Sequence, residues 1–218
     1  MIITIDGPSG TGKTTIAQIV AKRLGLVYFD TGAMYRSAAY LILKNQIDWC
    51  DESILKDFLQ NFTFEIGENT KEKRYFANGE DVTESIRTPE ISQFASLVST
   101  VKILREDLVA KQRLFGKKRA SALFEGRDMG SVVFPDAEVK IFLTATDEVR
   151  AQRRFKELSQ KISVDFETVL QEVKERDHRD STRAISPLKP ADDAIMLDTT
   201  HLGIEEVADR IIEIIRSF

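Results

Sequence analysis

Residues 7 to 14 read Gly-Pro-Ser-Gly-Thr-Gly-Lys-Thr, a complete match to the G-x-x-x-x-G-K-[ST] pattern. Glycines at this spacing let successive backbone N–H groups turn inward around a phosphate. Lys13 can reach the terminal phosphates of a nucleotide, and the Thr14 hydroxyl can bind Mg²⁺. A glycine-rich turn that merely caps a helix would leave both the lysine and the threonine unexplained. The pattern predicts that the chain binds a nucleoside triphosphate.

A second anion site is expected after the next apolar run. Residues 30–36 read Asp-Thr-Gly-Ala-Met-Tyr-Arg, and Asp30 or Thr31 can cap a helix that begins at Ala33. Arg36 then lies about one turn inside that helix. A helix N-terminus carries partial positive charge, and arginine can hold a phosphate with two hydrogen bonds. This segment is therefore suited to a second anion.

A loop of opposite charges follows the third apolar run. Residues 125–130 read Glu-Gly-Arg-Asp-Met-Gly, and the glycines allow tight turns around Arg127 and Asp128. These two side chains could simply pair with each other at the surface. Their place at the end of a strand, beside a phosphate loop, favours a polar recognition site.

Arginines also recur late in the chain. Arg176, Arg179 and Arg183 lie three and four residues apart, so on a helix they share one face. Three neighbouring guanidinium groups repel one another unless an anion lies among them. A phosphoryl group in transfer is such an anion, and the planar donors of arginine match it.

Motifs that are absent from the sequence limit the classes of reaction that the chain could catalyse. There is no Asn-Lys-x-Asp guanine motif and no His-Arg-Asp catalytic loop, and none of the first three motifs contains a histidine. A phosphate acceptor would need no general base, because its second pKa is about 6 and it is mostly dianionic at pH 7. Positioning and charge neutralisation then suffice for phosphoryl transfer.

Five short apolar runs alternate with segments of helical periodicity, which predicts a doubly wound α/β fold with a parallel sheet. The runs are residues 2–6, 27–31, 122–125, 139–145 and 194–199. Right-handed crossovers place the carboxyl ends of such strands at one edge of the sheet. We therefore expect Gly7, Asp30 and Gly126 along that edge.

Helix starts are visible in two places. Asp51 precedes an apolar face over residues 54–62, and Thr88 followed by proline opens a helix over residues 90–100. A final helix over residues 204–218 has one apolar stripe for packing.

Two regions depart from the alternation of strands and helices. Residues 62–87 contain alternating apolar residues and an Asn78-Gly79 turn, which predicts a small antiparallel insert with a structural role. The charged segments 148–161 and 166–183 lie between the fourth and fifth strands. A solvated helix face is the simpler interpretation, but this position favours a lid over residues 150–183.

Composition and charge exclude several classes of protein. The net charge of −4 argues against a general nucleic-acid binder, which needs a basic face. The single Cys50 excludes an intramolecular disulfide and a cysteine zinc site, and two histidines are too few for a histidine metal cluster. No apolar run approaches the ~20 residues of a membrane span, and no signal segment precedes the first strand. We expect a cytoplasmic protein.

The chain resembles the bacterial cytidylate kinases over essentially its whole length. The resemblance is carried by IDGPSGTGKTT (5–15), DTGAMYR (30–36), EGRDMGSVVFPDA (125–137), VKIFL (139–143) and KERDHRDSTRAISPL (174–188). It implies a P-loop three-layer α/β fold with a five-stranded parallel sheet, a small inserted antiparallel β domain and a helical lid. It also implies transfer of the γ-phosphoryl group of ATP, with Mg²⁺, to CMP or dCMP in pyrimidine metabolism.

The same resemblance implies residue roles. ATP would be bound by Gly7, Pro8, Ser9, Gly10, Thr11, Gly12, Lys13, Thr14 and Thr15, with Mg²⁺ on Thr14 but mainly on the ATP phosphates. CMP would be bound by Thr31, Arg36, Ser96, Arg105, Arg127, Asp128, Arg176, Asp180 and Arg183. Within that set, Ser96, Arg105 and Asp128 match cytosine-reading residues, and Asp180 matches the ribose ligand. The residues matched to catalysis are Lys13, Arg127, Arg176 and Arg183. Glu125 replaces a common aspartate and Ser131 a common threonine.

Other functions remain open at this point. The nearest are P-loop kinases for UMP, AMP or shikimate. A nucleotide-binding ATPase switch would instead hydrolyse slowly without an acceptor and would not need a second arginine-lined anion site. We expect one domain over residues 1–218, a monomer, and small-molecule nucleotides as its only partners, without nucleic acid or membrane.

Overall fold

The computed structural model describes residues 1–67, 73–160 and 162–218. The chain divides into two compact units. Unit 1 consists of Met1–Asp30 and Phe115–Phe218, and unit 2 is the continuous segment Thr31–Leu114. Each unit is described by itself below. Across the described ranges, no helix combines the length and apolar character needed to cross a bilayer.

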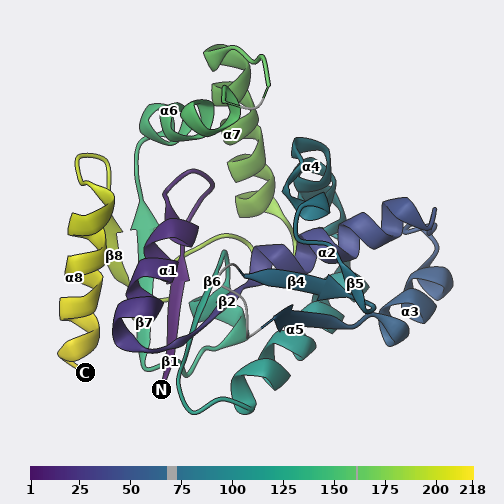
Figure 1. The fold of residues 1–218 in the computed structure, drawn as a ribbon, viewed down its shortest axis with the longest axis horizontal. Helices are drawn as coiled ribbons and strands as arrows, with labels where there is room; N and C mark the ends of the chain where they lie inside the picture. Colours follow the sequence, from purple (N-terminus) through teal and green to yellow (C-terminus); the bar gives the residue numbers. More distant parts are fainter. Residues whose placement is uncertain (68–72, 161) are drawn as a thin grey trace. The chain divides into compact units, whose positions relative to one another are not determined.

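Unit 1 contains a parallel five-stranded sheet in the order β2-β6-β1-β7-β8. The strands are β1 (Ile2–Asp6), β2 (Val27–Asp30), β6 (Ala122–Gly126), β7 (Val139–Thr144) and β8 (Ile195–Asp198). Figure 1 shows their carboxyl ends on one side of the sheet. In register, Asp6 pairs with Gly126, and Asp30 pairs with Glu125. The predicted doubly wound sheet is therefore confirmed, and its edge brings the three strand-end motifs together.

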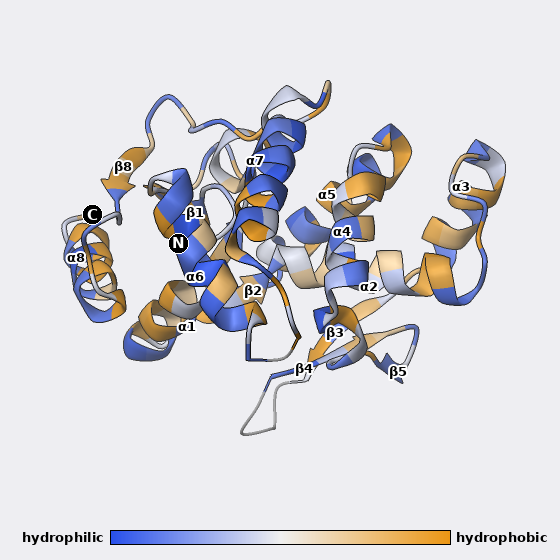
Figure 2. Cartoon of the chain, turned by 90° about the horizontal axis from the view of Figure 1, so that it is seen from above, coloured by the Kyte–Doolittle hydropathy of each residue, from blue (hydrophilic) through white to orange (hydrophobic). Residues whose placement is uncertain are grey.

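Both faces of this sheet are covered by apolar packing. Helices α1 (Lys13–Leu24) and α8 (Ile204–Arg216) share one buried cluster with strand residues such as Ile3 and Leu123. Figure 2 shows hydrophobic and hydrophilic sides on α8, as the predicted stripe requires. On the other face, Phe124 packs against Phe29 and Phe134 at ring-centroid distances of 5.4 and 4.3 Å. The alternation of Leu123 and Phe124 follows from the two-residue period of a strand.

The charged segments of unit 1 form α6 (Asp147–Leu158) and α7 (Phe166–Thr182). Both begin at side-chain caps, since Thr146 accepts from the Val149 N–H and Asp165 from the Thr168 N–H. The sequence predicts a helix over residues 148–161, whereas α6 ends at Leu158. Lys161 lies outside the described residues. A π-helical turn, η2 (Met129–Val133), follows β6.

Unit 2 combines helices with a small antiparallel sheet. Its elements are α2 (Thr31–Lys44), α3 (Glu52–Asn61), β3 (Phe64–Gly67), β4 (Arg74–Ala77), β5 (Glu80–Asp81), the 3₁₀ turn η1 (Ser85–Arg87), α4 (Pro89–Val98) and the first part of α5 (Lys102–Lys117). The sheet order is β3-β4-β5. Of the predicted insert over residues 62–87, residues 68–72 lie outside the described residues.

The local start and turn signals of unit 2 are confirmed. The Asp51 carboxylate accepts from the N–H groups of Ser53 and Ile54 at 2.8 and 3.1 Å, and Thr88 accepts from the Ile91 N–H at 3.2 Å. Asn78 and Gly79 have φ values of 49° and 79°, the left-handed conformation that an Asn-Gly hairpin turn needs. Helix α2 differs from expectation because it begins at Thr31, two residues before Ala33.

Candidate active site around the phosphate loop

At two points, the phosphate loop between β1 and α1 has a backbone conformation that residues with a side chain rarely adopt. Gly10 and Gly12 have φ values of 77° and 86°. A Cβ atom on Gly10 would also lie 2.7 Å from the Arg150 carbonyl oxygen. Helix α1 begins at Lys13 with no side-chain cap on its first N–H groups. These donors, together with the positive end of the helix, can bind an anion.

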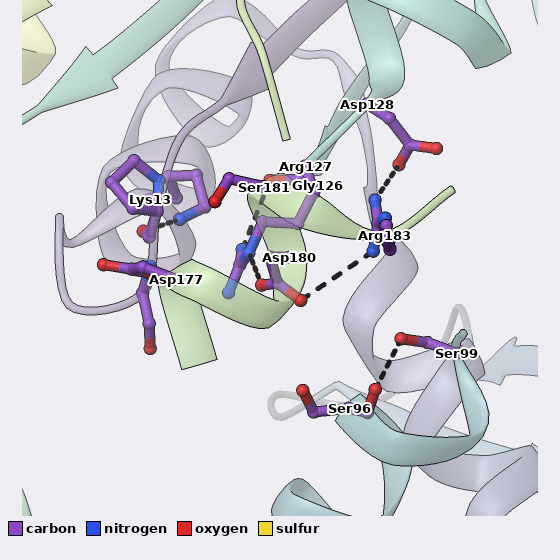
Figure 3. A network of polar contacts seen from close by, with 12 residues as sticks. Lys13, Ser96, Ser99, Gly126, Arg127, Asp128, Asp177, Asp180, Ser181 and Arg183 are labelled. Atoms are coloured by element: carbon purple, nitrogen blue, oxygen red, sulfur yellow. Dashed lines mark hydrogen bonds and ion pairs between the residues drawn. The ribbon is translucent and has the colours of Figure 1, made fainter. Parts of the chain in front are cut away.

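Lys13 is buried within this loop (Figure 3). Its ammonium group donates to the Pro8 carbonyl at 2.6 Å and to the Thr11 hydroxyl at 3.2 Å. Burial lowers the pKa of Lys13 well below its usual range, and the positive charges of Arg127 and Arg176 lower it further. Three cationic side chains therefore act on one small region, where a polyanion would restore the charged lysine.

Glu125 at the end of β6 accepts a hydrogen bond from the Thr14 hydroxyl at 3.1 Å and another from the Tyr28 hydroxyl. Burial, and then the negative charge of Asp30, raise the pKa of Glu125 to about 7. From the sequence, Glu125 is expected in a charged loop and as a variant of a family residue, and its contact with Thr14 is not predicted. The signal was an apolar run ending in an acid, which in many P-loop proteins supplies the carboxylate near the metal.

Asp6 is a second buried acid that the sequence did not single out. Its carboxylate accepts the N–H groups of Met129 and Gly130 at 2.9 and 2.8 Å. Burial raises the pKa of Asp6 to about 7, although these two hydrogen bonds oppose the shift. The residue thus joins the strand before the phosphate loop to the segment that follows Asp128.

A chain of buried charges lies at the same edge of unit 1 (Figure 3). The Nε of Arg127 donates to Asp180 at 3.0 Å, and Arg183 approaches both Asp180 and Asp128 at 3.8 Å. Burial alone would raise the pKa of Asp180, but Arg127, Arg176 and Arg183 together hold it below its usual value. Unit 1 therefore brings five of the predicted acceptor-site residues together.

The prediction that Arg176, Arg179 and Arg183 share one helix face is wrong for Arg183. Helix α7 stops at Thr182, and Arg183 has an extended ψ of 140°. Its Nε donates to the Ser186 carbonyl at 2.6 Å, which fixes the side chain where the chain leaves the helix. The Arg183 side chain consequently reaches Asp128 and Asp180 from beyond the helix.

The remaining predicted acceptor residues belong to unit 2. Thr31 and Arg36 lie in the first turns of α2, Ser96 in α4 and Arg105 in α5. The Arg105 Nε donates to the Ser99 carbonyl at 3.0 Å, and its guanidinium lies 5.2 Å from the centre of the Tyr35 ring.

Ser99 connects two of these residues, because its hydroxyl donates to the Ser96 carbonyl at 2.9 Å (Figure 3). Ser96 and Arg105 are both buried. A buried hydroxyl and a buried guanidinium on neighbouring helices provide polar groups that can read the edge of a base.

Comparison with known proteins identifies the family of the chain. The family model described as cytidylate kinase matches residues 3–217. The cytidylate kinase of Protochlamydia amoebophila (strain UWE25) is 48% identical over 98% of this chain and 95% of its own length. That of Bacillus subtilis (strain 168) is 45% identical over 97% and 94%. In fold alone, an uncharacterized protein from Eubacterium ventriosum ATCC 27560 is similar, with a TM-score of 0.53 at 14% identity over 100% and 99% of the two chains. By sequence, the chain belongs to the cytidylate kinase family.

Proposed function

We propose that the protein transfers the γ-phosphoryl group of ATP to CMP or dCMP, giving ADP and CDP or dCDP. The observation that carries the proposal is that buried Lys13, which donates to the Pro8 carbonyl of the phosphate loop, lies within the electrostatic reach of Arg127 and Arg176. Burial lowers the pKa of Lys13 most, and the two arginines lower it further. Cations gathered in this way are suited to a site that binds two phosphate groups and the charge passing between them.

In the proposed reaction, an oxygen of the CMP phosphate attacks the γ-phosphorus of ATP. The bond from that phosphorus to the β–γ bridging oxygen breaks, and ADP leaves. Because the acceptor phosphate is mostly dianionic at pH 7, no side chain has to remove a proton. Lys13 and the arginines hold the two nucleotides in line and offset the negative charge of the transferring group.

We propose that ATP binds with Mg²⁺. Thr14 and Glu125 provide hydroxyl and carboxylate oxygens in mutual contact, which is the donor chemistry that Mg²⁺ prefers. Among the described residues, no three His, Cys, Asp or Glu side chains gather as a metal cage. The oxygens of Thr14 and Glu125 would therefore contribute only part of the coordination of an ion that is held mainly by the substrate phosphates. When bound, the ion would offset phosphate charge, and Thr14 and Glu125 would orient it.

The acceptor roles are likewise part of this proposal. Thr31, Arg36, Arg127, Arg176 and Arg183 would hold the CMP phosphate or the transferring group. Ser96, Arg105 and Asp128 would read cytosine, and Asp180 would accept from ribose hydroxyls. Arg127 and Asp180 contact each other, so the residue proposed for the phosphate and the residue proposed for the ribose would be coupled.

At a coarser scale, we propose that residues 150–183 act as the lid and residues 62–87 as a structural insert of one kinase domain. The enzyme would work as a cytoplasmic monomer in pyrimidine nucleotide metabolism, with neither nucleic acid nor membrane as partner. Sedimentation of the purified chain tests the monomer.

An ADP-release assay tests the reaction. CMP and dCMP should support rapid ADP formation with ATP and Mg²⁺, whereas UMP, AMP and shikimate should support far less. A preference for one of the last three would assign a different small-acceptor kinase. Hydrolysis at the same rate with and without every acceptor would indicate an ATPase switch and contradict the proposal.

A further inference from the structure

The backbone of Ser9, in the phosphate loop, is held at both its N–H and its carbonyl group by side chains from α6 and α7. Its N–H donates to an oxygen of Asp177 at 3.2 Å, and its carbonyl accepts from Arg150 Nη1 at 2.9 Å. The same Arg150 nitrogen donates to the other oxygen of Asp177, which closes a ring of three contacts. All three residues lie in unit 1.

Arg150 is itself rigidly supported. Only 4% of its side chain is exposed. Its Nε donates to the Ala145 carbonyl at 3.0 Å, and its Nη2 to Asp147 at 2.5 Å. The backbone of Arg150 also packs so closely on Gly10 that no side chain would fit there. The loop is thus braced by a fixed group rather than by a mobile surface arginine.

Bracing has a physical purpose in a loop rich in glycine. Glycine loses more conformational freedom than other residues when it is ordered, so an unsupported loop would oppose nucleotide binding. A loop whose N–H groups are already directed inward binds phosphate with less ordering cost. The charge balance matters too, because an Asp177 carboxylate without Arg150 would repel the nucleotide.

We propose that Asp177 and Arg150 are positioning residues that clamp the Ser9 backbone, keep the phosphate loop in its binding shape and couple it to α6 and α7. Neither residue is among those assigned above to ATP or CMP. The inference rests on the proposed function only in taking the loop as the ATP site.

The test measures ATP affinity by titration calorimetry without acceptor, so it does not depend on the identity of the acceptor. Asp177→Ala and Arg150→Ala should each weaken ATP binding about 10- to 100-fold. The double variant should bind ATP no more weakly than the weaker single variant, because both side chains act on the backbone of one residue, Ser9. Asp177→Asn should weaken ATP binding clearly less than Asp177→Ala, since its amide oxygen still accepts the Ser9 N–H, although its NH2 group cannot accept from Arg150.

Glu175→Ala is the matched control. Glu175 is exposed on the same helix and contacts Gln171 at 2.8 Å, away from the loop. Its removal should leave ATP affinity unchanged. If Arg150→Ala does not fold, Arg150→Lys keeps the charge but loses the fork of donors, and it should also weaken ATP binding.

Unchanged or tighter ATP binding by folded Asp177→Ala would overturn the clamp, and tighter binding would mean that the carboxylate competes with phosphate. Equal losses in Asp177→Asn and Asp177→Ala would also overturn it, because the hydrogen bond would then not matter. In a parallel steady-state assay, the KM for CMP should stay within about twofold. If the unchanged protein binds ATP but does not phosphorylate CMP, the proposed function fails while the clamp is still decided by the affinities.

Discussion

Lys13 stands among groups that act on its charge in opposite directions. Arg127 and Arg176 disfavour the charged ammonium, whereas Glu125 and Asp6 favour it, and burial is the largest cause of its lowered pKa. The phosphates of a nucleotide would tip this balance toward the charged form. The charged form of Lys13 is therefore expected to contribute to the reaction more than to the stability of the fold.

Lys13→Ala should nearly abolish phosphoryl transfer. The ammonium group would bind the β and γ phosphates and would act most strongly as charge shifts in the transition state. Its loss should lower kcat/KM by on the order of 10³-fold or more. Steady-state kinetics on protein with unchanged circular dichroism measures this, with Lys22→Ala, an exposed lysine of α1, as control. A folded Lys13→Ala enzyme that keeps a tenth of the activity would refute the assignment.

Glu125→Gln should lower activity and yet stabilise the protein at high pH. The pKa of Glu125 is raised in the fold, so between its usual value of 4.5 and about 7 the native state holds the extra proton. Stability contributed by this residue therefore falls as pH rises through that range, and the penalty is complete above pH 7. Glutamine carries no such penalty.

Thermal unfolding at pH 5 and pH 8 tests the sign. The Tm of Glu125→Gln relative to the unchanged protein should rise with pH, by on the order of 5 °C between the two conditions. Activity with Mg²⁺ should fall at least about tenfold. A Tm difference independent of pH would show that ionisation of the buried Glu125 carboxyl group does not destabilise the fold.

Asp128→Ala should reduce discrimination between cytosine and uracil. Cytosine offers an amino donor and an acceptor N3, and uracil offers the opposite groups at those places. A carboxylate can accept from the amino group, and Arg105 can donate to N3 or the carbonyl. Since a hydrogen bond to a charged group contributes about 1.5–3 kcal/mol, two reversed bonds give roughly 10²–10⁴-fold discrimination.

The measured quantity is the CMP:UMP ratio of kcat/KM. It should narrow in Asp128→Ala and in Arg105→Ala because CMP loses more than UMP. An unchanged ratio in both variants would place base recognition elsewhere.

Among the elements, α6 is anchored near its start by Arg150 and α7 near its end by Asp177, and both helices are otherwise rich in charged residues. Arg150 in the first turn of α6 is buried against the loop, while most of α7 is polar (Figure 2). Such helices can keep one end fixed as the other rearranges. The caps at Thr146 and Asp165 set where each helix begins.

The segment from about 150 to 183 should close over the two nucleotides and exclude water. Closure would bring arginines to the transferring group and protect it from hydrolysis. Limited proteolysis with and without a bisubstrate analogue measures it, and cleavage between α6 and α7 should slow several-fold. Equal cleavage rates would instead support a static solvated face.

On the scale of the whole molecule, the features that could be predicted from the sequence are those determined by local signals. The five strands, the caps at Asp51 and Thr88 and the Asn78-Gly79 turn each depend on a few neighbouring residues. The gathering of strand ends followed from the general rule for parallel sheets.

Long-range contacts could not be predicted in the same way. The Ser9 backbone meets Asp177 and Arg150 across separations of 168 and 141 residues, and Asp6 meets Met129 across 123. Which of many charged side chains meets a given backbone group depends on packing that no local pattern records. The end of α7 before Arg183 has a different cause, because the contact that holds the Arg183 side chain is local and is made to a carbonyl three residues later. The repeated spacing of the arginines gives no sign that the helix stops there.

The order β2-β6-β1 has a consequence for synthesis on the ribosome. The first two strands to emerge are not neighbours, and the strand that must lie between them ends at Gly126, 96 residues after Asp30. At 5–20 residues per second, the nascent chain waits roughly 5–20 s with two apolar strands unpaired along those edges. The continuous segment Thr31–Leu114 is completed during this interval and can compact first. Translation speed across that segment thus sets how long two unpaired, aggregation-prone strands are exposed in the cell.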